Sequence, residues 1–125
     1  MNLDEYRDKN DLGEVQLNGK RYGFPGYIGQ VLYHDRRVYI VLEKFRDRTS
    51  DEDLFSNVFA FDLGSGNLLW RIEPCPQKMG GYPIPYIDLH IHHEKLYVRG
   101  PVDNYNEIDT ETGKVKFVGQ SLPQE

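Results

Sequence analysis

Short runs of alternating apolar and polar residues, separated by turn residues, occupy most of the chain. Alternation of this kind is typical of β-strands that turn one face toward a core. Four runs are expected in a first block, at residues 29–33, 37–42, 57–62 and 68–73. Four more follow in a second block, at residues 87–92, 95–100, 105–109 and 115–120. The pattern predicts an all-β fold with two four-stranded antiparallel sheets.

The two blocks are copies of each other. Residues 23–25 (Gly-Phe-Pro) return as residues 81–83 (Gly-Tyr-Pro), an offset of 58 residues, and residues 61–70 return as residues 108–117, an offset of 47. The first copy therefore carries 11 extra residues, which fall between Glu43 and Asn57. An internal repeat of this length is typical of folds built by stacking one supersecondary unit on the next.

Turn chemistry supports the same organisation. Asn18-Gly19 is a strong two-residue hairpin signal between two short apolar runs, and polar residues 34–37 and 92–95 turn the first strand pair of each copy. We expect one domain over residues 1–125. Its parts are a short helix or a mobile arm (1–13), an N-terminal hairpin and loop (14–27), repeat 1 (28–73), a Pro/Gly/Tyr linker (74–86), repeat 2 (87–120) and a tail (121–125).

The third and fourth strands of each copy are joined by an Asp-x-x-Ser/Thr-Gly turn. Residues 60–70, Ala-Phe-Asp-Leu-Gly-Ser-Gly-Asn-Leu-Leu-Trp, resemble the repeat of pyrroloquinoline-quinone-type (quinoprotein-like) β-propellers. The second copy keeps Asp109, Thr112 and Gly113 but has Phe117 at the tryptophan position. The resemblance implies four-stranded blades. Two blades do not close a ring, so no quinone or other cofactor is expected.

Composition and charge narrow the function. The chain has one alanine and 15 aromatic residues other than its single tryptophan, which disfavours a helical bundle. Its net charge of −5 disfavours nucleic acids and anionic membranes as partners and favours a basic protein. Acidic residues near the first methionine are unlike a signal peptide, so a cytoplasmic location is expected. The single Cys75 forms no internal disulfide.

The two faces of each predicted sheet differ between the copies. Repeat 2 has one apolar face and one polar face, whereas both faces of repeat 1 are largely apolar. The second apolar face of repeat 1 includes Leu32, Tyr39, Val41, Val58 and Ala60. We expect the N-terminal hairpin to cover it; the alternative is a partner or a second copy of the chain, which would make a homodimer through this face.

Two groups of residues are candidate sites. Asp88, His90 and His92 alternate along one strand, so their side chains share a face and could bind a metal such as zinc. The charged insertion and the aromatic linker are a candidate surface for a protein partner. Its residues are Phe45, Asp47, Asp51, Glu52, Asp53, Tyr82 and Tyr86.

Three classes of function follow. The first is a non-enzymatic protein-binding module, for example an acidic intracellular inhibitor of the immunity-protein type. The second is a metal-binding protein or metal-dependent enzyme that uses Asp88, His90 and His92. The third is a carbohydrate or small-ligand binding domain that uses Tyr27, Tyr82 and Tyr86.

Overall fold

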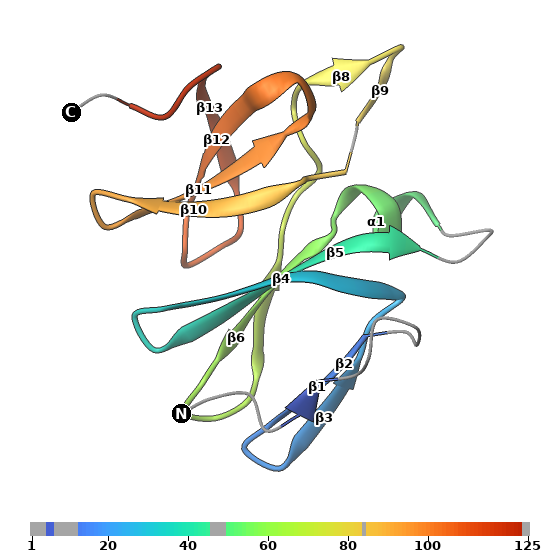
Figure 1. The fold of residues 1–125 in the computed structure, drawn as a ribbon, viewed down its shortest axis with the longest axis vertical. Coiled ribbons are helices and arrows are strands. Elements are labelled where there is room, and N and C mark those ends of the chain that lie inside the picture. The colour runs from blue at the N-terminus through green and yellow to red at the C-terminus, as the bar shows by residue number, and fades with distance from the viewer. Residues whose placement is uncertain (1–4, 7–12, 46–49, 84, 124–125) are drawn as a thin grey trace.

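Three antiparallel sheets stack face to face along the long axis of the molecule (Figure 1). The structure is a computed structural model that describes residues 5–6, 13–45, 50–83 and 85–123. The N-terminal sheet has the order β1-β2-β3, the first repeat sheet β4-β5-β6-β7 and the second repeat sheet β10-β11-β12-β13. No helix in the described part of the chain is long and apolar enough to cross a membrane.

The strand bounds confirm the predicted duplication. The N-terminal sheet consists of β1 (Glu5–Tyr6), β2 (Glu14–Leu17) and β3 (Lys20–Gly23). The first repeat sheet consists of β4 (Gly26–His34), β5 (Arg37–Phe45), β6 (Val58–Asp62) and β7 (Leu68–Arg71), with α1 (Asp51–Phe55) before β6. The second consists of β10 (Asp88–His92), β11 (Lys95–Gly100), β12 (Asn104–Ile108) and β13 (Val115–Gly119), with the 3₁₀ turn η1 (Pro101–Asp103) before β12.

Two segments differ from the expectation. Glu5 and Tyr6 were expected in a helix or a mobile arm, but they form β1 and pair with Gln16 and Val15 of β2. The linker between the repeats contains a small hairpin of β8 (Lys78–Met79) and β9 (Tyr82–Pro83). Strands of two residues leave no alternation in the sequence from which to predict them.

Two-residue turns with positive φ close the hairpins, as the turn signals indicate. Asn18 and Gly19 have φ values of 49° and 77°, and the equivalent residues of the two repeats are Asp35-Arg36 and His93-Glu94, with φ values of 50° and 65° in both. Positive φ at both positions matches the twist of the flanking strands. In the longer turn of repeat 1, the Ser65 side chain lowers the pKa of Asp62, and so does the Ser65 N–H, which donates to Asp62 Oδ2 at 2.8 Å.

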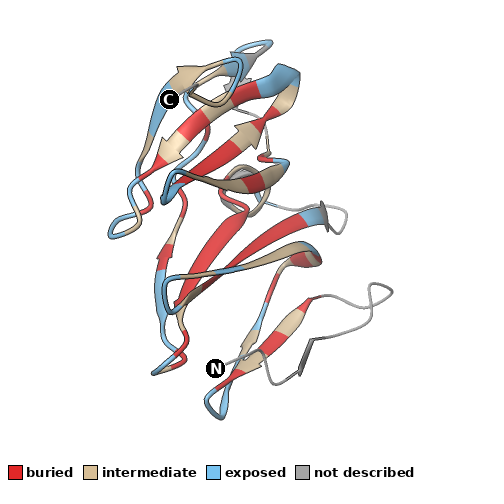
Figure 2. Ribbon diagram, turned by 60° about the vertical axis from the view of Figure 1, so that its left-hand side comes forward, coloured by how far each residue is buried: buried red, intermediate tan, exposed pale blue. Residues whose placement is uncertain are grey.

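The first repeat sheet is buried on both faces, and Figure 2 shows it as the most buried part of the stack. Its Val38, Ile40 and Phe59 pack against Val15, Leu17 and Phe24 of the N-terminal segment. Its other face packs against the second repeat sheet. The residues of this second contact include Tyr39, Val41, Val58, Ala60, Trp70, Leu89, Leu96, Val98 and Ile108.

This packing corrects one expectation and bears on a second. The N-terminal hairpin covers the opposite face of repeat 1 from the one we assigned to it, because the second repeat sheet covers that one. The alternative of a homodimer through this face lacks an exposed surface, since Val41, Val58 and Ala60 are 0% exposed within a single chain. Alternation identifies which side chains share a face, but it does not say which neighbour covers that face.

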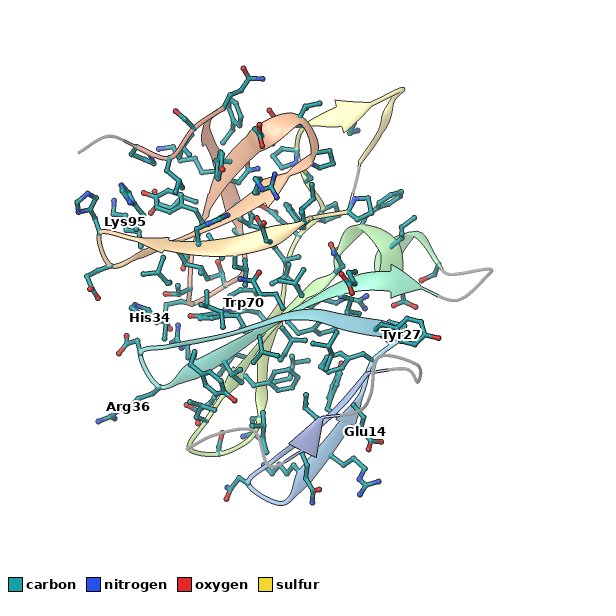
Figure 3. The ribbon with its side chains drawn as sticks, viewed as in Figure 1. Glu14, Tyr27, His34, Arg36, Trp70 and Lys95 are labelled. Atoms are coloured by element: carbon teal, nitrogen blue, oxygen red, sulfur yellow. The ribbon has the colours of Figure 1, made fainter. Side chains whose placement is uncertain are left out.

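Polar contacts fix the two repeat sheets in register. The Gln30 side chain accepts from Leu89 N–H at 2.7 Å and donates to Leu89 O at 3.1 Å. Trp70 lies between the sheets (Figure 3), and its indole N–H donates to Thr110 O at 2.7 Å. Arg37 donates to the same carbonyl oxygen at 2.6 Å and to Glu111 at 2.9 Å. The first sheet therefore holds the Asp-x-x-Thr-Gly turn of the second.

Candidate functional site

The outer face of the second repeat sheet is the side of β10–β13 that points away from the first repeat sheet. Cross-strand pairing shows which residues lie on this face. Asp88 lies opposite Arg99, His90 opposite Tyr97, and Glu107 opposite both Tyr97 and Lys116. The equivalent face of the first repeat sheet packs against the second repeat sheet. The outer face therefore stands where a further sheet of the stack would dock.

An ionic network occupies one end of this face. Arg99 donates to Asp88 through Nε at 3.0 Å and Nη2 at 2.8 Å, and to Asp103 through Nη1 at 3.1 Å. These hydrogen bonds from Arg99, with a further contact from His90, hold the pKa of Asp88 below its usual range. All three guanidinium nitrogens are thus engaged, and the arginine is fixed in one orientation.

Two rings lie beside this network. His90 Nε2 is 2.9 Å from Asp88 Oδ1, and the His90 ring lies 5.8 Å from the Tyr105 ring. Both side chains are partly exposed. Rigid aromatic side chains present contact area at a low cost in conformational entropy.

The η1 turn projects from the same end of the sheet. Val102 is 62% exposed and has φ 54° and ψ 35°, a conformation that β-branched residues rarely adopt. The contact between Arg99 and Asp103 anchors the neighbouring residue, which also has positive φ. An apolar side chain is thereby presented to solvent next to the ionic network.

The tail covers another part of the outer face. His92 Nε2 lies 2.7 Å from Pro123 O, so the chain beyond β13 returns over the sheet, as its path in Figure 1 shows. Tyr97 is only 4% exposed although no sheet packs on this side. Its equivalent, Tyr39, is buried between the two repeat sheets.

A hollow of about 660 Å³ lies at the opposite end, between the β10–β11 and β12–β13 hairpins. Lys95 on one hairpin and Lys114 and Lys116 on the other are among the residues that line it. Figure 3 shows Lys95 at a hairpin end close to His34 of the first repeat sheet. His34 Nε2 is 3.7 Å from Glu94 Oε2, so the two hairpin ends meet.

The predicted metal site is not supported. Among the described residues, no group of three or more His, Cys, Asp or Glu side chains is arranged to hold a metal ion. Two of the predicted ligands have other partners: Arg99 binds both oxygens of Asp88, and His92 contacts Pro123 O, whereas His90 contacts Asp88 itself. Sharing a strand face did not bring the three side chains to one point.

The predicted surface for a protein partner is described only in part. Asp47 lies outside the described residues, and for Phe45, Asp51, Glu52 and Tyr82 only the backbone is described. Asp53 forms an ion pair with Arg71 at 2.8 Å, which attaches α1 to the sheet edge. The prediction that Tyr86 anchors a partner is wrong.

Tyr86 is a core residue that is 2% exposed. Its hydroxyl donates to Glu73 O at 2.8 Å, and burial raises its pKa. Its backbone N–H donates to Asn57 Oδ1 at 2.9 Å, so the end of the linker is fastened to the first repeat sheet. A carbohydrate site on Tyr27, Tyr82 and Tyr86 loses one of its three side chains for the same reason. Burial also raises the pKa of the Cys75 thiol.

Sequence reasoning identified the polar face of repeat 2 but missed its importance. Arg99, Tyr105 and Glu107 lie on this face but are not among the candidate site residues of the sequence analysis. The signal that could have singled them out was the comparison of the repeats, in which Val41, Val58 and Ala60 stand at the equivalent positions. A face that forms an interface in one copy is a candidate interface in the other.

Comparison with known proteins gives the family alone. No curated protein and no solved structure matches the sequence. A family model described as "Domain of unknown function (DUF7957)" matches residues 6–119, which span both repeat sheets and most of the N-terminal sheet. The chain therefore belongs to the DUF7957 family.

Proposed function

We propose that the protein is a non-enzymatic protein-binding module whose partner docks on the outer face of the second repeat sheet. One observation carries the proposal. This face is equivalent to the interface face of the first repeat sheet, and Arg99, Tyr105 and Glu107 replace the apolar Val41, Val58 and Ala60. A charged face in this position suits a transient partner, because its side chains remain hydrated in the free protein when the partner is absent.

The residue types on the face support this use. Tyr and Arg are enriched among residues that dominate binding energy in protein interfaces. Asp88 and Asp103 hold Arg99 in place before a partner arrives, which reduces the entropy lost on binding. The exposed Val102 adds an apolar contact beside them.

The positions of the reactive groups favour binding over catalysis. Asp88 is paired with Arg99, and the lone thiol, that of Cys75, is buried with a raised pKa. A general base or a nucleophile needs access to a substrate and a pKa near the working pH. The pKa of Asp88 is lowered and both of its oxygens accept from Arg99, whereas Cys75 is buried, so neither group meets both requirements.

An intracellular inhibitor of the immunity-protein type is the most specific version of this proposal. The net charge of −5 supports a partner with a basic surface. The insertion adds to this, since residues 43–53 contain five acidic and three basic residues. A toxin gene next to the gene for this protein would support this version.

Capture of the partner by the full chain, followed by reconstitution with the purified partner, tests the proposal. We expect the double variant His90→Ala/Tyr105→Ala to bind the purified partner at least tenfold more weakly than wild type, measured by calorimetry. The matched control is Leu68→Ala/Leu69→Ala on β7, where both leucines are exposed on the other repeat sheet. Equal loss in the control, or unchanged affinity in the face variant, would refute the proposal.

A further inference from the structure

Each sheet of the stack holds the long turn of the sheet that follows it. The N-terminal sheet holds the turn of repeat 1: Asn18 Nδ2 donates to Gly64 O at 3.1 Å, and Lys20 binds the Asn67 side chain. The first repeat sheet holds the turn of repeat 2 through Arg37 and Trp70. In both cases a cationic side chain and backbone carbonyl oxygens are part of the contact.

The second repeat sheet has an equivalent place for the long turn of a following sheet. No described residue of such a turn occupies it. The hollow of about 660 Å³ is lined by Lys95, which is equivalent to Arg37, and by Glu107 and Lys116, which are equivalent to Ala60 and Leu69. Arg37 is the residue that binds both Thr110 O and the Glu111 carboxylate. Lys95 therefore stands where the stack elsewhere binds a carbonyl oxygen and an acid.

A shift in strand register changes the chemistry of this position. In the first repeat sheet Trp70 lies opposite Ala60, on the face toward the next sheet. In the second, Lys116 lies opposite Glu107, and Phe117 lies opposite Asn106 on the other face. The second repeat sheet thus presents an amine where the first presents an indole, so an apolar sheet is a poor occupant.

The lysines of the hollow are available to an anion. Lys95 is 3.9 Å from Glu107, a long contact for an ion pair. Lys114 and Lys116 form no ion pair within the described part of the chain, whereas Asp109 accepts from Glu111 N–H and Glu94 faces His34. Glu94 and Asp109 thus have partners other than the lysines, Glu107 contacts Lys95, and two of the three amines have no ion-pair partner among the described residues.

We propose that this hollow binds an acidic turn of the partner protein, with Lys95, Lys114 and Lys116 contacting its carboxylates and backbone carbonyl oxygens. This inference rests on the proposed function and names the feature of the partner that the face recognises. The bound turn would take the place that residues 110–113 take on the first repeat sheet. A turn of this kind is compatible with a partner whose remaining surface is basic.

A peptide tests the inference without the partner. The probe is a backbone-cyclised hairpin peptide whose tip has the sequence of residues 109–113, Asp-Thr-Glu-Thr-Gly, added to the isotope-labelled full chain. We expect amide shifts centred on residues 94–96, 107–110 and 114–116, with a dissociation constant on the order of 1 mM or below. Lys95→Glu and Lys116→Glu should each weaken binding at least tenfold, and Lys78→Glu, the matched charge control on β8, should not.

A charge swap completes the test. A peptide with Lys in place of the Asp and the Glu should fail to bind wild type and should bind the double variant Lys95→Glu/Lys116→Glu. Absence of peptide shifts, or equal weakening by Lys78→Glu, would overturn the inference. So would a second copy as the occupant, seen as wild-type dimers in light scattering that become monomers in the double variant.

The two proposals can fail separately. If His90→Ala/Tyr105→Ala weakens partner binding but the peptide leaves the hollow unperturbed, the face binds a partner and the inference that the hollow binds an acidic turn is wrong. If the peptide binds at the hollow but those substitutions leave partner binding unchanged, the hollow is a site and the wider face is not.

Discussion

The contact between Trp70 and Gly113 offers the sharpest test of how the repeat sheets are held together. Trp70 is the chain's one tryptophan and is 7% exposed between the sheets. Gly113 has φ +80°, and a Cβ atom added to it would lie 2.7 Å from Trp70 Cε3 and 2.9 Å from Cδ2. The glycine is therefore required both by its backbone conformation and by the ring against it.

The magnitudes follow from these contacts. Trp70→Ala should destabilise the protein by about 3–5 kcal/mol, the range for removing a large buried aromatic side chain. The lost indole hydrogen bond adds little, because Arg37 still donates to Thr110 O. A domain of this size is stable by about 5–15 kcal/mol, so the variant should remain folded.

Gly113→Ala combines two costs in the wild-type background. The left-handed backbone conformation costs about 1–2 kcal/mol in a residue with a side chain. Overlap with the indole ring adds about 1–3 kcal/mol more. When Trp70 is already alanine, only the first cost remains, and the double-mutant cycle should give a coupling energy of about 1–3 kcal/mol.

Urea denaturation followed by far-ultraviolet circular dichroism is the suitable assay, because the substitution removes the tryptophan fluorescence. Trp70→Leu provides the same cycle at a smaller cavity cost if Trp70→Ala is too unstable. Two results would refute the reasoning. One is a loss below about 1 kcal/mol for Trp70→Ala, and the other is an equal cost of Gly113→Ala in both backgrounds.

Three further predictions concern polar groups, all measured by urea denaturation. Gln30→Ala should cost about 2 kcal/mol, because it leaves Leu89 N–H and Leu89 O without their partner at the sheet interface; a cost near zero would contradict this. Arg37→Ala should cost about 1–3 kcal/mol, whereas Lys95→Ala, at the equivalent position of repeat 2, should stay within about 0.5 kcal/mol of wild type; equal costs would contradict the difference we infer between the two positions. Asp88 has a lowered pKa in the folded protein, so its stabilisation is complete at neutral pH and declines as the pH falls below about 4. Asp88→Asn should therefore reduce the loss of stability between pH 7 and pH 3, and an unchanged loss would show that other groups govern acid unfolding.

The candidate site was only partly predictable. Alternation along residues 88–92 correctly put Asp88, His90 and His92 on one face, since that pattern depends only on the geometry of one strand. Whether those side chains meet depends on their neighbours across the sheet, and Arg99 and Pro123 engage two of them. Tyr86 was predicted as an exposed anchor because the Pro-rich linker reads as a loop, yet its last residue packs into the core.

The sequence by itself determined the local structure of this protein. The strands of the two repeat sheets follow from alternation, the two-residue turns at Asn18-Gly19 and His93-Glu94 follow from turn chemistry, and the duplication follows from internal similarity. The tertiary structure alone decided which sheet covers which face, and that the tail returns to contact His92. Such choices depend on contacts between segments far apart in the chain, which alternation within one strand does not show.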